Sequence, residues 1–238
     1  MSFQLLYEGA NVAYGTTSRG SRRAVVVGWL LRKQAGGYGA LIWSDYIPVD
    51  IRDLYEVRDY HHAAAILKTE FPDEFAELCD ALRQFRITTR EILAPGGNES
   101  DIPKKISKLL RPGWKEEKLE ASLVVAGKPR KTDTHKIDYV KGRVAFDLEW
   151  NSKDQTFDRD LYAFRTFFEF DNISVAVLLT RSTADLNDVF RKLGKEVMAK
   201  YGASTTHLDK LIPRLDAGRA GGCPVLVFGI TRKVVSDL

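Results

Sequence analysis

The 238-residue sequence has few cysteines and no long apolar run. Its two cysteines, Cys79 and Cys223, lie far apart in the chain, which argues against a disulfide framework or a zinc site and fits a reducing cytoplasm. No stretch approaches the roughly 20 apolar residues that a membrane span requires. The N-terminus, MSFQLLYEGAN, lacks the basic start and apolar core of a secretory signal. With 44% hydrophobic and 29% charged residues, the composition indicates a globular protein outside the membrane.

The formal net charge is only +4, but the charges are unevenly distributed. Residues 96–143 hold 12 Lys and Arg against 7 Asp and Glu, residues 144–180 hold 3 against 7, and residues 181–238 hold 10 against 6. Basic segments suit a polyanion, because neutralised phosphates release counterions. An acidic segment between them suits metal ions. On charge alone, however, simple solvation of the surface is the preferred explanation.

The first half of the chain changes from strand-like to helical patterning. Residues 1–48 contain strand-like apolar runs separated by Gly36 and Gly37, and they form the predicted β-rich N-terminal extension. From residue 51 the apolar spacing is helical, beginning with Leu54, Val57 and His61. Two further helices are predicted over residues 75–85 and 102–110.

The second half alternates strands and helices. Strands are predicted over residues 119–126, 173–180 and 224–230, a β-hairpin over residues 136–150, and helices over residues 157–168 and 189–197. Residues 127–135 are assigned to a basic loop and residues 200–210 to a turn after a helix ending at Gly202. Strands that alternate with helices predict an α/β fold with a central mixed sheet flanked by helices, over residues 49–238.

Two acids alternate with apolar residues in the second strand of the predicted hairpin, RVAFDLEW (143–150). Side chains alternate between the two faces of a strand, so Asp147 and Glu149 share one face, about 7 Å apart. The other face carries only apolar side chains: Val144, Phe146, Leu148 and Trp150. This apolar face can pack under a helix, which leaves both carboxylates on the opposite face.

A third acid joins this face if the hairpin closes tightly. A two-residue turn at Lys141-Gly142 sets Asp138 opposite Ala145, and opposed residues share a face. Three clustered carboxylates require a cation nearby. Hard oxygen ligands suit Mg²⁺, which lowers the pKa of bound water and so generates a nucleophile. A solvated polar face explains the alternation at least as well.

In the metal-site interpretation, each acid has a role. Asp138 and Asp147 hold the metal ion, while Glu149 binds a second ion or orients the attacking water. The backbone carbonyl of Leu148 is a further candidate ligand.

In this hairpin the sequence resembles a known group of enzymes. KIDYVKGRVAFDLEWNSKD is similar to the active-site hairpin of PD-(D/E)XK nucleases, and more narrowly to that of the BglII/BstYI/BamHI branch of type II restriction endonucleases. The Asp and the acid-x-acid pair of that branch fall on Asp138, Asp147 and Glu149. The wider superfamily has a lysine where Glu149 stands, and this branch more often has a glutamate where Asp147 stands, which bears on the metal geometry.

A second segment extends the resemblance. GGNESDIPKKISKLL (96–110) is similar to the segment of this branch in which an Asn opens a helix beside the active site, here Asn98. A helix-start loop is the alternative, and Asn98 fits both. The resemblance covers roughly residues 51–230.

The resemblance implies a restriction-endonuclease-like core, Mg²⁺ as cofactor, and a homodimer that binds palindromic double-stranded DNA. The residues past the acidic strand then reach the major groove, although a strand-to-helix cap explains them equally well: Asn151, Ser152, Lys153 and Asp154. A second candidate loop, with a plain turn as its alternative, contains Ser204, Thr205, Thr206 and His207. Phosphate contacts are assigned to Lys128, Arg130, Lys131 and His135.

These features together predict a type II site-specific deoxyribonuclease. Two alternatives stay open. A repair or structure-specific nuclease on the same fold would cut without a fixed sequence, and a non-catalytic DNA-binding protein would bind DNA without a divalent metal. The basic loops fit all three, whereas the acidic hairpin favours the enzymes.

Overall fold

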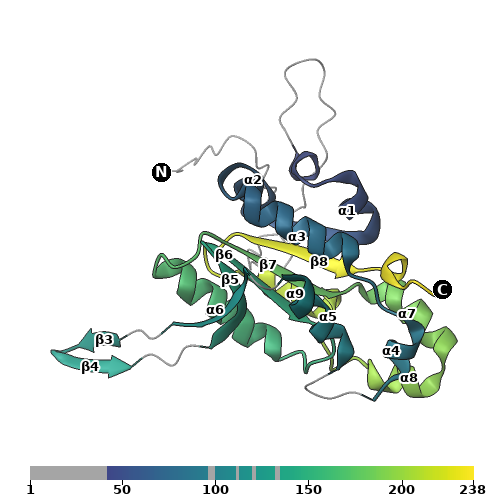
Figure 1. Ribbon diagram of the computed structural model, residues 1–238. Coiled ribbons are helices and arrows are strands. Elements are labelled where there is room, and N and C mark those ends of the chain that lie inside the picture. The colour runs from purple at the N-terminus through teal and green to yellow at the C-terminus, as the bar shows by residue number, and fades with distance from the viewer. Residues whose placement is uncertain (1–41, 96–99, 111–112, 120–121, 132–134) are drawn as a thin grey trace, which may run out of the picture. The chain divides into compact units, whose positions relative to one another are not determined.

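A computed structural model describes residues 42–95, 100–110, 113–119, 122–131 and 135–238 (Figure 1). The chain divides into two units, residues 1–40 and 41–238, and the second contains all of the described residues. Most of the predicted N-terminal extension, residues 1–41, lies outside the described residues. Residues 42–48 contain a short 3-10 helix, η1 (Trp43–Tyr46). None of the described helices combines the length and the apolar character that crossing a membrane requires.

A six-stranded mixed sheet forms the centre of this unit, in the order β1-β8-β7-β6-β5-β2. Three central strands run parallel to one another: β6 (Val144–Glu149), β7 (Val175–Arg181) and β8 (Val225–Ile230). The outer strands pair antiparallel with their neighbours: β1 (Tyr55–Tyr60), β5 (Lys136–Lys141) and β2 (Lys115–Lys118). All residues of the parallel strands are buried, as expected of a sheet covered on both faces.

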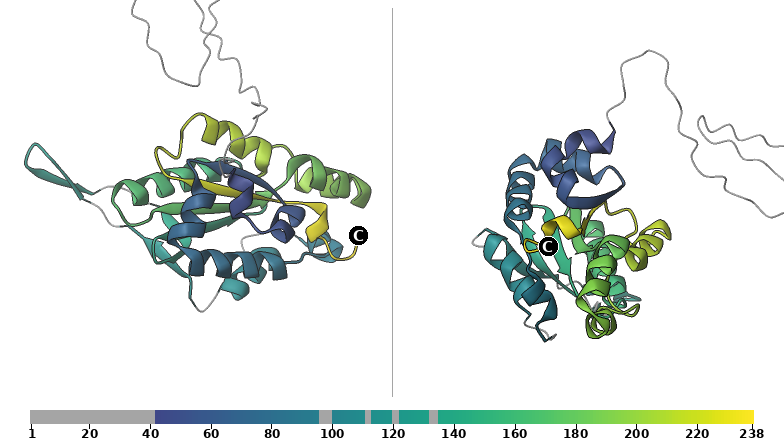
Figure 2. Two further views of the ribbon diagram at one scale, coloured as in Figure 1. Left: turned by 90° about the horizontal axis from the view of Figure 1, so that it is seen from above. Right: turned by 90° about the vertical axis from the view of Figure 1, so that its right-hand side faces the viewer.

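Helices cover both faces of the sheet, and Figure 2 gives two further views of them. One core packs against α1 (Val49–Leu54), α2 (Ala63–Glu70), α3 (Pro72–Gln84), α4 (Thr89–Leu93), α5 (Asp101–Leu110), α7 (Thr183–Leu193) and α8 (Lys195–Lys200). The core on the opposite face packs against α6 (Thr156–Glu169) and α9 (Leu208–Asp216). The chain ends after a short 3-10 helix, η2 (Arg232–Val234). The predicted α/β fold with a central mixed sheet flanked by helices is confirmed.

Several elements form where local pattern predicts them. Helix α3 begins with Pro72 at its first position and carries acids in its first turn, where the helix dipole favours negative charge. The same agreement holds for α5, α6 and the parallel strands. The alternation in β6 is also confirmed, because Phe146 lies in the first core and Ala145 in the second.

The helix predicted through Leu54, Val57 and His61 is wrong beyond its first turn. Helix α1 ends at Leu54, and Tyr55–Tyr60 is strand β1, which pairs along its whole length with β8. Three apolar positions spaced by three or four residues do not reveal this long-range pairing. His61 then adopts a left-handed φ of 54°, which ends the strand.

The predicted basic loop over residues 127–135 contains a strand instead. β4 (Lys128–Lys131) pairs antiparallel with β3 (Ser122–Val125) in a separate two-stranded sheet. Ala126 and Gly127 connect the two strands with φ values of 50° and 75°. Two consecutive positive φ values are those of a type I′ hairpin turn, which the Ala-Gly pair signals less clearly than Asn-Gly.

The C-terminal helices also differ in their bounds. The helix predicted over residues 189–197 is divided at Gly194, whose φ is 121°, into α7 and α8. The turn predicted over residues 200–210 is shorter, because α9 begins at Leu208. Strand β2 was not predicted, since its sequence KEEK is charged and exposed throughout and offers no apolar alternation.

Candidate active site

Strands β5 and β6 form the predicted hairpin, but its turn lies one residue later. Lys141 pairs with Val144, so Gly142 and Arg143 make the turn, rather than Lys141 and Gly142. Gly142 has a φ of 55°, a conformation that glycine adopts without a steric penalty.

The later turn gives Asp138 a different partner. Val140 faces Ala145, and Tyr139 faces Phe146. Asp138 is therefore aligned with Asp147 rather than with Ala145, and its backbone N–H donates a 2.8 Å hydrogen bond to Oδ1 of Asp147. When the turn moves by one residue, each residue of β5 faces a β6 residue two positions further along. Because side chains alternate with a period of two, Asp138 stays on the same face of the hairpin as Asp147 and Glu149.

A β-bulge distorts β5 between Ile137 and Val140. Lys115 of β2 pairs with Val140 of β5, and Glu117 pairs with Ile137. The chain thus advances by two residues in β2 but by three residues in β5. The extra residue therefore lies in β5. Bulges bend a strand and re-aim a side chain, and they are frequent beside active sites.

The acids of β6 lie between the sheet and α6. Asp147 is 4% exposed and Glu149 is 7% exposed, whereas Asp138 is on the exposed part of the hairpin. A further acid, Asp160 of α6, is 4% exposed, and its carboxyl group lies within hydrogen-bonding reach of that of Glu149. Two acids thus come from a strand of the sheet, one from its hairpin partner and one from the covering helix.

Burial raises the pKa of each of these carboxyl groups. For Asp147 the rise is large, and the charges of Asp160, Asp138 and Glu149 add to it. Burial, followed by the charge of Glu149, raises the pKa of Asp160 to about 8. Asp138 is more exposed, but its carboxyl group is still partly desolvated, and this together with the charge of Glu116 of β2 raises its pKa. Such mutual repulsion in a dry site is relieved when a cation binds.

The donor set fits a hard divalent cation. Glu149 Oε2 and Asp160 Oδ2 are buried and accept no hydrogen bond from the part of the chain that the structure describes, so each has a free lone pair. Nη2 of Arg159 lies 3.9 Å from Glu149 Oε1 and 3.4 Å from Asp160 Oδ1, but half of its side chain is exposed to solvent, which weakens the attraction. Among the described residues, no three His, Cys, Asp or Glu side chains already have the geometry of metal ligands. Metal binding therefore requires side chains to turn toward the ion.

Asp160 was not predicted as a site residue. Its signal in the sequence is its place within a helical apolar stripe, between Phe157 and Phe164, where a carboxylate is otherwise unfavourable. Leu148, the predicted backbone ligand, lies between the two acids of β6 with its side chain in the first core.

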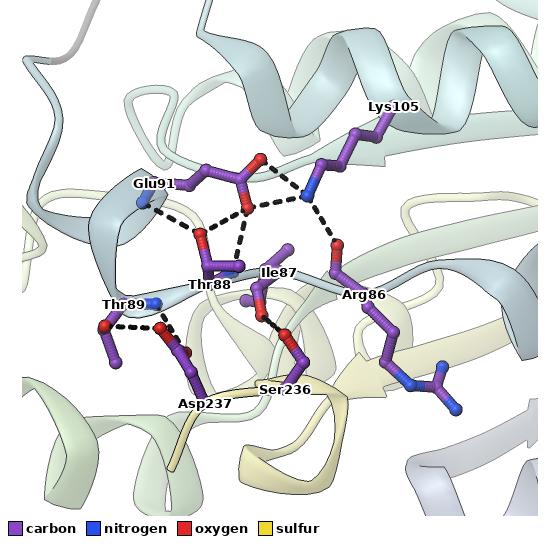
Figure 3. Close-up of polar contacts among 8 residues, drawn as sticks. All are labelled: Arg86, Ile87, Thr88, Thr89, Glu91, Lys105, Ser236 and Asp237. Atoms are coloured by element: carbon purple, nitrogen blue, oxygen red, sulfur yellow. Dashed lines mark hydrogen bonds and ion pairs between the residues drawn. The ribbon is translucent and has the colours of Figure 1, made fainter.

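Asn98 lies outside the described residues. The helix that precedes it in the sequence, α4, is held at both ends by hydrogen bonds. At its start, Glu91 accepts a hydrogen bond of 2.8 Å from the Thr88 backbone and one of 2.7 Å from Lys105 of α5, as Figure 3 shows. Thr89 also binds the carboxylate of Asp237 near the C-terminus through hydrogen bonds of 2.8 and 2.7 Å (Figure 3). At its end, Lys200 donates to the carbonyls of Ile92 and Ala94.

The two candidate base-reading loops lie side by side. Lys153 and Thr205 form an antiparallel β-bridge. The Asp154 N–H donates to the Ser204 carbonyl over 3.0 Å, and the Thr206 N–H donates to the Ser152 carbonyl over 2.9 Å. The structure thus joins two segments that are about 50 residues apart in the sequence.

The side chains of these loops differ in exposure. Lys153 and Ser204 are exposed, Asn151, Ser152 and His207 are partly exposed, and Thr205 and Thr206 are buried. His207 Nδ1 lies 3.0 Å from Thr183 Oγ1. Neither loop is thus presented to solvent as a whole.

The first loop, residues 151–154, does not cap α6, which was the alternative explanation for its residues. The N-cap residue of α6 is Gln155, with no side-chain cap. Asp154 lies 3.5 Å from Nη2 of Arg214 of α9 instead, and Asp158 accepts a 3.0 Å hydrogen bond from Nε of the same arginine.

The candidate phosphate contacts belong to the β3–β4 hairpin and its end. Lys128 is exposed at the start of β4, Arg130 and Lys131 follow in the same strand, and His135 is exposed just before β5.

A mixed sheet between two helical layers, with paired acids at the end of a central strand and a third acid across the hairpin, is consistent with a restriction-endonuclease-like core. Residues 55–230 match the family described as restriction endonuclease BglII/BglIII. The chain therefore belongs to this family of type II restriction endonucleases, which are DNA-binding hydrolases. A sequence comparison with curated proteins gives no match.

Proposed function

We propose that this enzyme hydrolyses phosphodiester bonds at a palindromic site in double-stranded DNA, as a Mg²⁺-dependent homodimer in the cytoplasm. The observation that carries the proposal is the set of four carboxyl groups around the end of β6, two of which keep a buried oxygen with no hydrogen-bond partner among the described residues. The two cysteines are buried and unpaired, which agrees with a reducing compartment.

Each acid of the hairpin has a role that follows from its place. Asp138 and Asp147, aligned across the hairpin, would hold the metal ion together with the Leu148 carbonyl. When bound, Mg²⁺ supplies Lewis acidity and lowers the pKa of a bound water. Glu149 would hold a second ion or orient the attacking water, since Oε2 of its carboxylate has no hydrogen-bond partner within the described ranges. Asn98 would stand beside this site, as the resemblance implies.

With its pKa raised to about 8, Asp160 would be protonated near neutral pH and would hold Glu149 from the α6 side by donating a hydrogen bond to it. A carboxylate that orients water must itself be fixed, because misplacement by about 1 Å costs up to about 100-fold in rate. In-line attack of water would leave a 5′-phosphate and a 3′-hydroxyl, the outcome that the resemblance implies.

DNA recognition would use the joined loops and the basic hairpin. Lys153 and Ser204 are the most exposed candidates and suit direct contact with bases or phosphates. The remaining loop candidates would read bases or hold the loops in shape: Asn151, Ser152, Asp154, Thr205, Thr206 and His207. Lys128, Arg130 and Lys131 would contact phosphates, which makes binding dependent on salt.

The test is to incubate the enzyme with mixed plasmid DNA and Mg²⁺ and to sequence the ends. One short palindrome at every end supports the proposal. Ends without a common sequence would indicate a structure-specific nuclease, and DNA binding without cutting would indicate a non-catalytic protein.

Variants of the acids test the assignment of roles. Asp147→Asn and Glu149→Gln should each lower cleavage at least about 100-fold while preserving DNA binding. Asp73→Asn is the matched control, because Asp73 is exposed on α3, on the opposite face of the sheet. Undiminished cutting by either site variant would reject the assignment.

A further inference from the structure

Arg181 is a buried arginine that forms no ion pair with any carboxylate among the described residues. It is the last residue of β7 and is 1% exposed. Burial lowers its pKa to about 10. Burying a charge without a counter-ion is costly, and an apolar side chain of similar volume is often more stable in such a place. Its presence therefore calls for a specific reason.

Its hydrogen bonds join three backbone and side-chain acceptors from two segments. Nε donates to the Trp150 carbonyl over 2.8 Å and to the Thr206 carbonyl over 3.0 Å. Nη2 donates to Thr205 Oγ1 over 2.6 Å. Only arginine offers several donors in one rigid plane.

Three aromatic rings hold that plane in place. The guanidinium carbon lies 5.0 Å from the ring centre of Tyr201, 5.5 Å from that of Phe190 and 5.9 Å from that of Trp150. Each distance is within the range of a cation–π contact. The rings of Phe190 and Tyr201 are themselves stacked, 4.3 Å apart, so the guanidinium lies in a preformed setting.

The acceptors connect Arg181 to both candidate base-reading loops. Trp150 directly follows Glu149 and precedes the first loop, residues 151–154, whereas Thr205 and Thr206 belong to the second. Thr180, the residue before Arg181, donates from Oγ1 to the Glu149 carbonyl over 2.8 Å. The end of β7 thus fixes the end of the acidic strand and both loops together.

We propose that Arg181 is a positioning residue for site recognition, which holds the two loops in register with the acidic end of β6. This inference rests on the proposed function for its consequence in cleavage. Bases read by either loop then influence the placement of Glu149, because a single guanidinium joins them. A correct site permits cleavage, whereas a site that displaces a loop also displaces the acid.

The first test uses Arg181→Lys, which keeps the charge but loses the planar donor group. The palindrome found by end sequencing and the same site with one altered base pair serve as substrates. The ratio of kcat/KM between the two should fall about 10-fold to 100-fold. Simple loss of folded enzyme lowers both rates equally and leaves the ratio unchanged. An unchanged ratio would overturn the proposal.

The second test does not depend on cleavage. Hydrogen exchange should become faster in residues 150–155 and 203–207 of Arg181→Lys, and stay unchanged in α3. Arg191→Lys is the control, because Arg191 is exposed on α7 and forms its ion pair with Asp188 of the same helix. If the enzyme cuts no DNA, the proposed function fails, but exchange in the two loops still decides whether Arg181 joins them. Protection retained in either loop would refute the joining role.

Milder variants serve if Arg181→Lys does not fold. Thr205→Val removes the acceptor of Nη2 and leaves Arg181 in place, so it should change the cleavage ratio and the exchange in the same direction, by a smaller factor. Thr205→Ser keeps the hydroxyl and should restore both values to those of the wild type. Equal behaviour of the valine and serine variants would also overturn the proposal.

Discussion

Asp160 of α6 and Glu149 of β6 hold their carboxyl groups within hydrogen-bonding reach of each other, and one oxygen of each accepts no hydrogen bond from any described residue. Two carboxylates at this separation repel when both are ionised, and burial increases the repulsion. The pair therefore binds either a proton or a cation more tightly than an isolated carboxylate does. Both the stability of the protein and its affinity for metal should depend on this pair.

Without metal, the stability of the protein should fall as the pH rises. The pKa of Asp160 in the folded state is raised from 3.8 to about 8. A raised pKa means that its stabilising contribution is complete below pH 3.8 and is lost as the pH rises through about 8. In EDTA, Asp160→Asn should be about 1–3 kcal/mol more stable than the wild type at pH 9 and lose this advantage at pH 5. Urea unfolding of both proteins at pH 5 and pH 9 measures this difference in stability. If the free energies of unfolding of the two proteins change with pH in parallel, the prediction is wrong.

With metal, the same substitution should have the opposite effect. Asp160→Asn removes a negative charge next to Glu149 and should weaken metal affinity about 10-fold to 100-fold. Thermal unfolding with increasing Ca²⁺ measures this, because binding to the folded state raises Tm. The control is Glu169→Gln, at the exposed end of the same helix, where the glutamate pairs with Arg165. Equal shifts in Tm for both variants would exclude Asp160 from the site.

Gly142 should tolerate substitution poorly. Its φ of 55° costs other residues about 1–2 kcal/mol, so Gly142→Ala should lower the free energy of unfolding by this amount. Gly142→Asn should cost less. Gly222→Ala serves for comparison, since a Cβ there meets only an ordinary contact of 3.6 Å with Phe168. Equal urea midpoints for the two alanine variants would argue against the turn at residues 142–143.

The capping box of α4 should contribute measurably to stability. The Thr88 hydroxyl accepts from the Glu91 N–H over 3.3 Å, while the Glu91 carboxylate accepts from the Thr88 N–H (Figure 3). Thr88→Ala should cost about 1 kcal/mol. Thr88→Ser retains the cap and should recover most of the loss in a urea titration; a serine variant as unstable as the alanine one would point to packing of the methyl group instead.

Lys153 should contribute to DNA binding through charge. Lys153→Ala should weaken binding to all sequences alike and reduce the slope of log affinity against log salt by about 1. The comparison is Lys68→Ala, which removes an exposed charge from α2, on the face of the sheet opposite α6. A Lys153 variant whose affinity falls only for the recognition sequence would mean that this lysine reads bases.

The sequence predicted the elements whose own residues determine them. Strands β6, β7 and β8 are buried throughout and rich in apolar residues, and α3 and α6 carry regular apolar stripes. Strand β1 was missed because it depends on β8, which lies some 165 residues further along the chain. Strand β2 was missed because a charged edge strand has no apolar pattern.

The candidate site was also predicted only in part, because some of its geometry follows from local pattern and the rest from long-range contacts. Alternation along one strand places Asp147 and Glu149 on a common face without any other information. The exact partner of Asp138 depends on the position of the turn, which the Lys141-Gly142-Arg143 sequence leaves open by one residue. Asp160 reaches Glu149 only because α6 folds back across the sheet, and no local pattern records that crossing. Arg181 likewise gains its contacts from three separate segments.

The charged strand β2 also limits how two copies of the enzyme can meet. Its four residues, Lys115 to Lys118, are all exposed, and Glu116 forms a 2.6 Å ion pair with Lys136. A neighbouring chain that continued the sheet at this border would have to strip water from four charged side chains. Pairing of two chains through this edge is therefore disfavoured, and partly folded chains are less prone to aggregate through it.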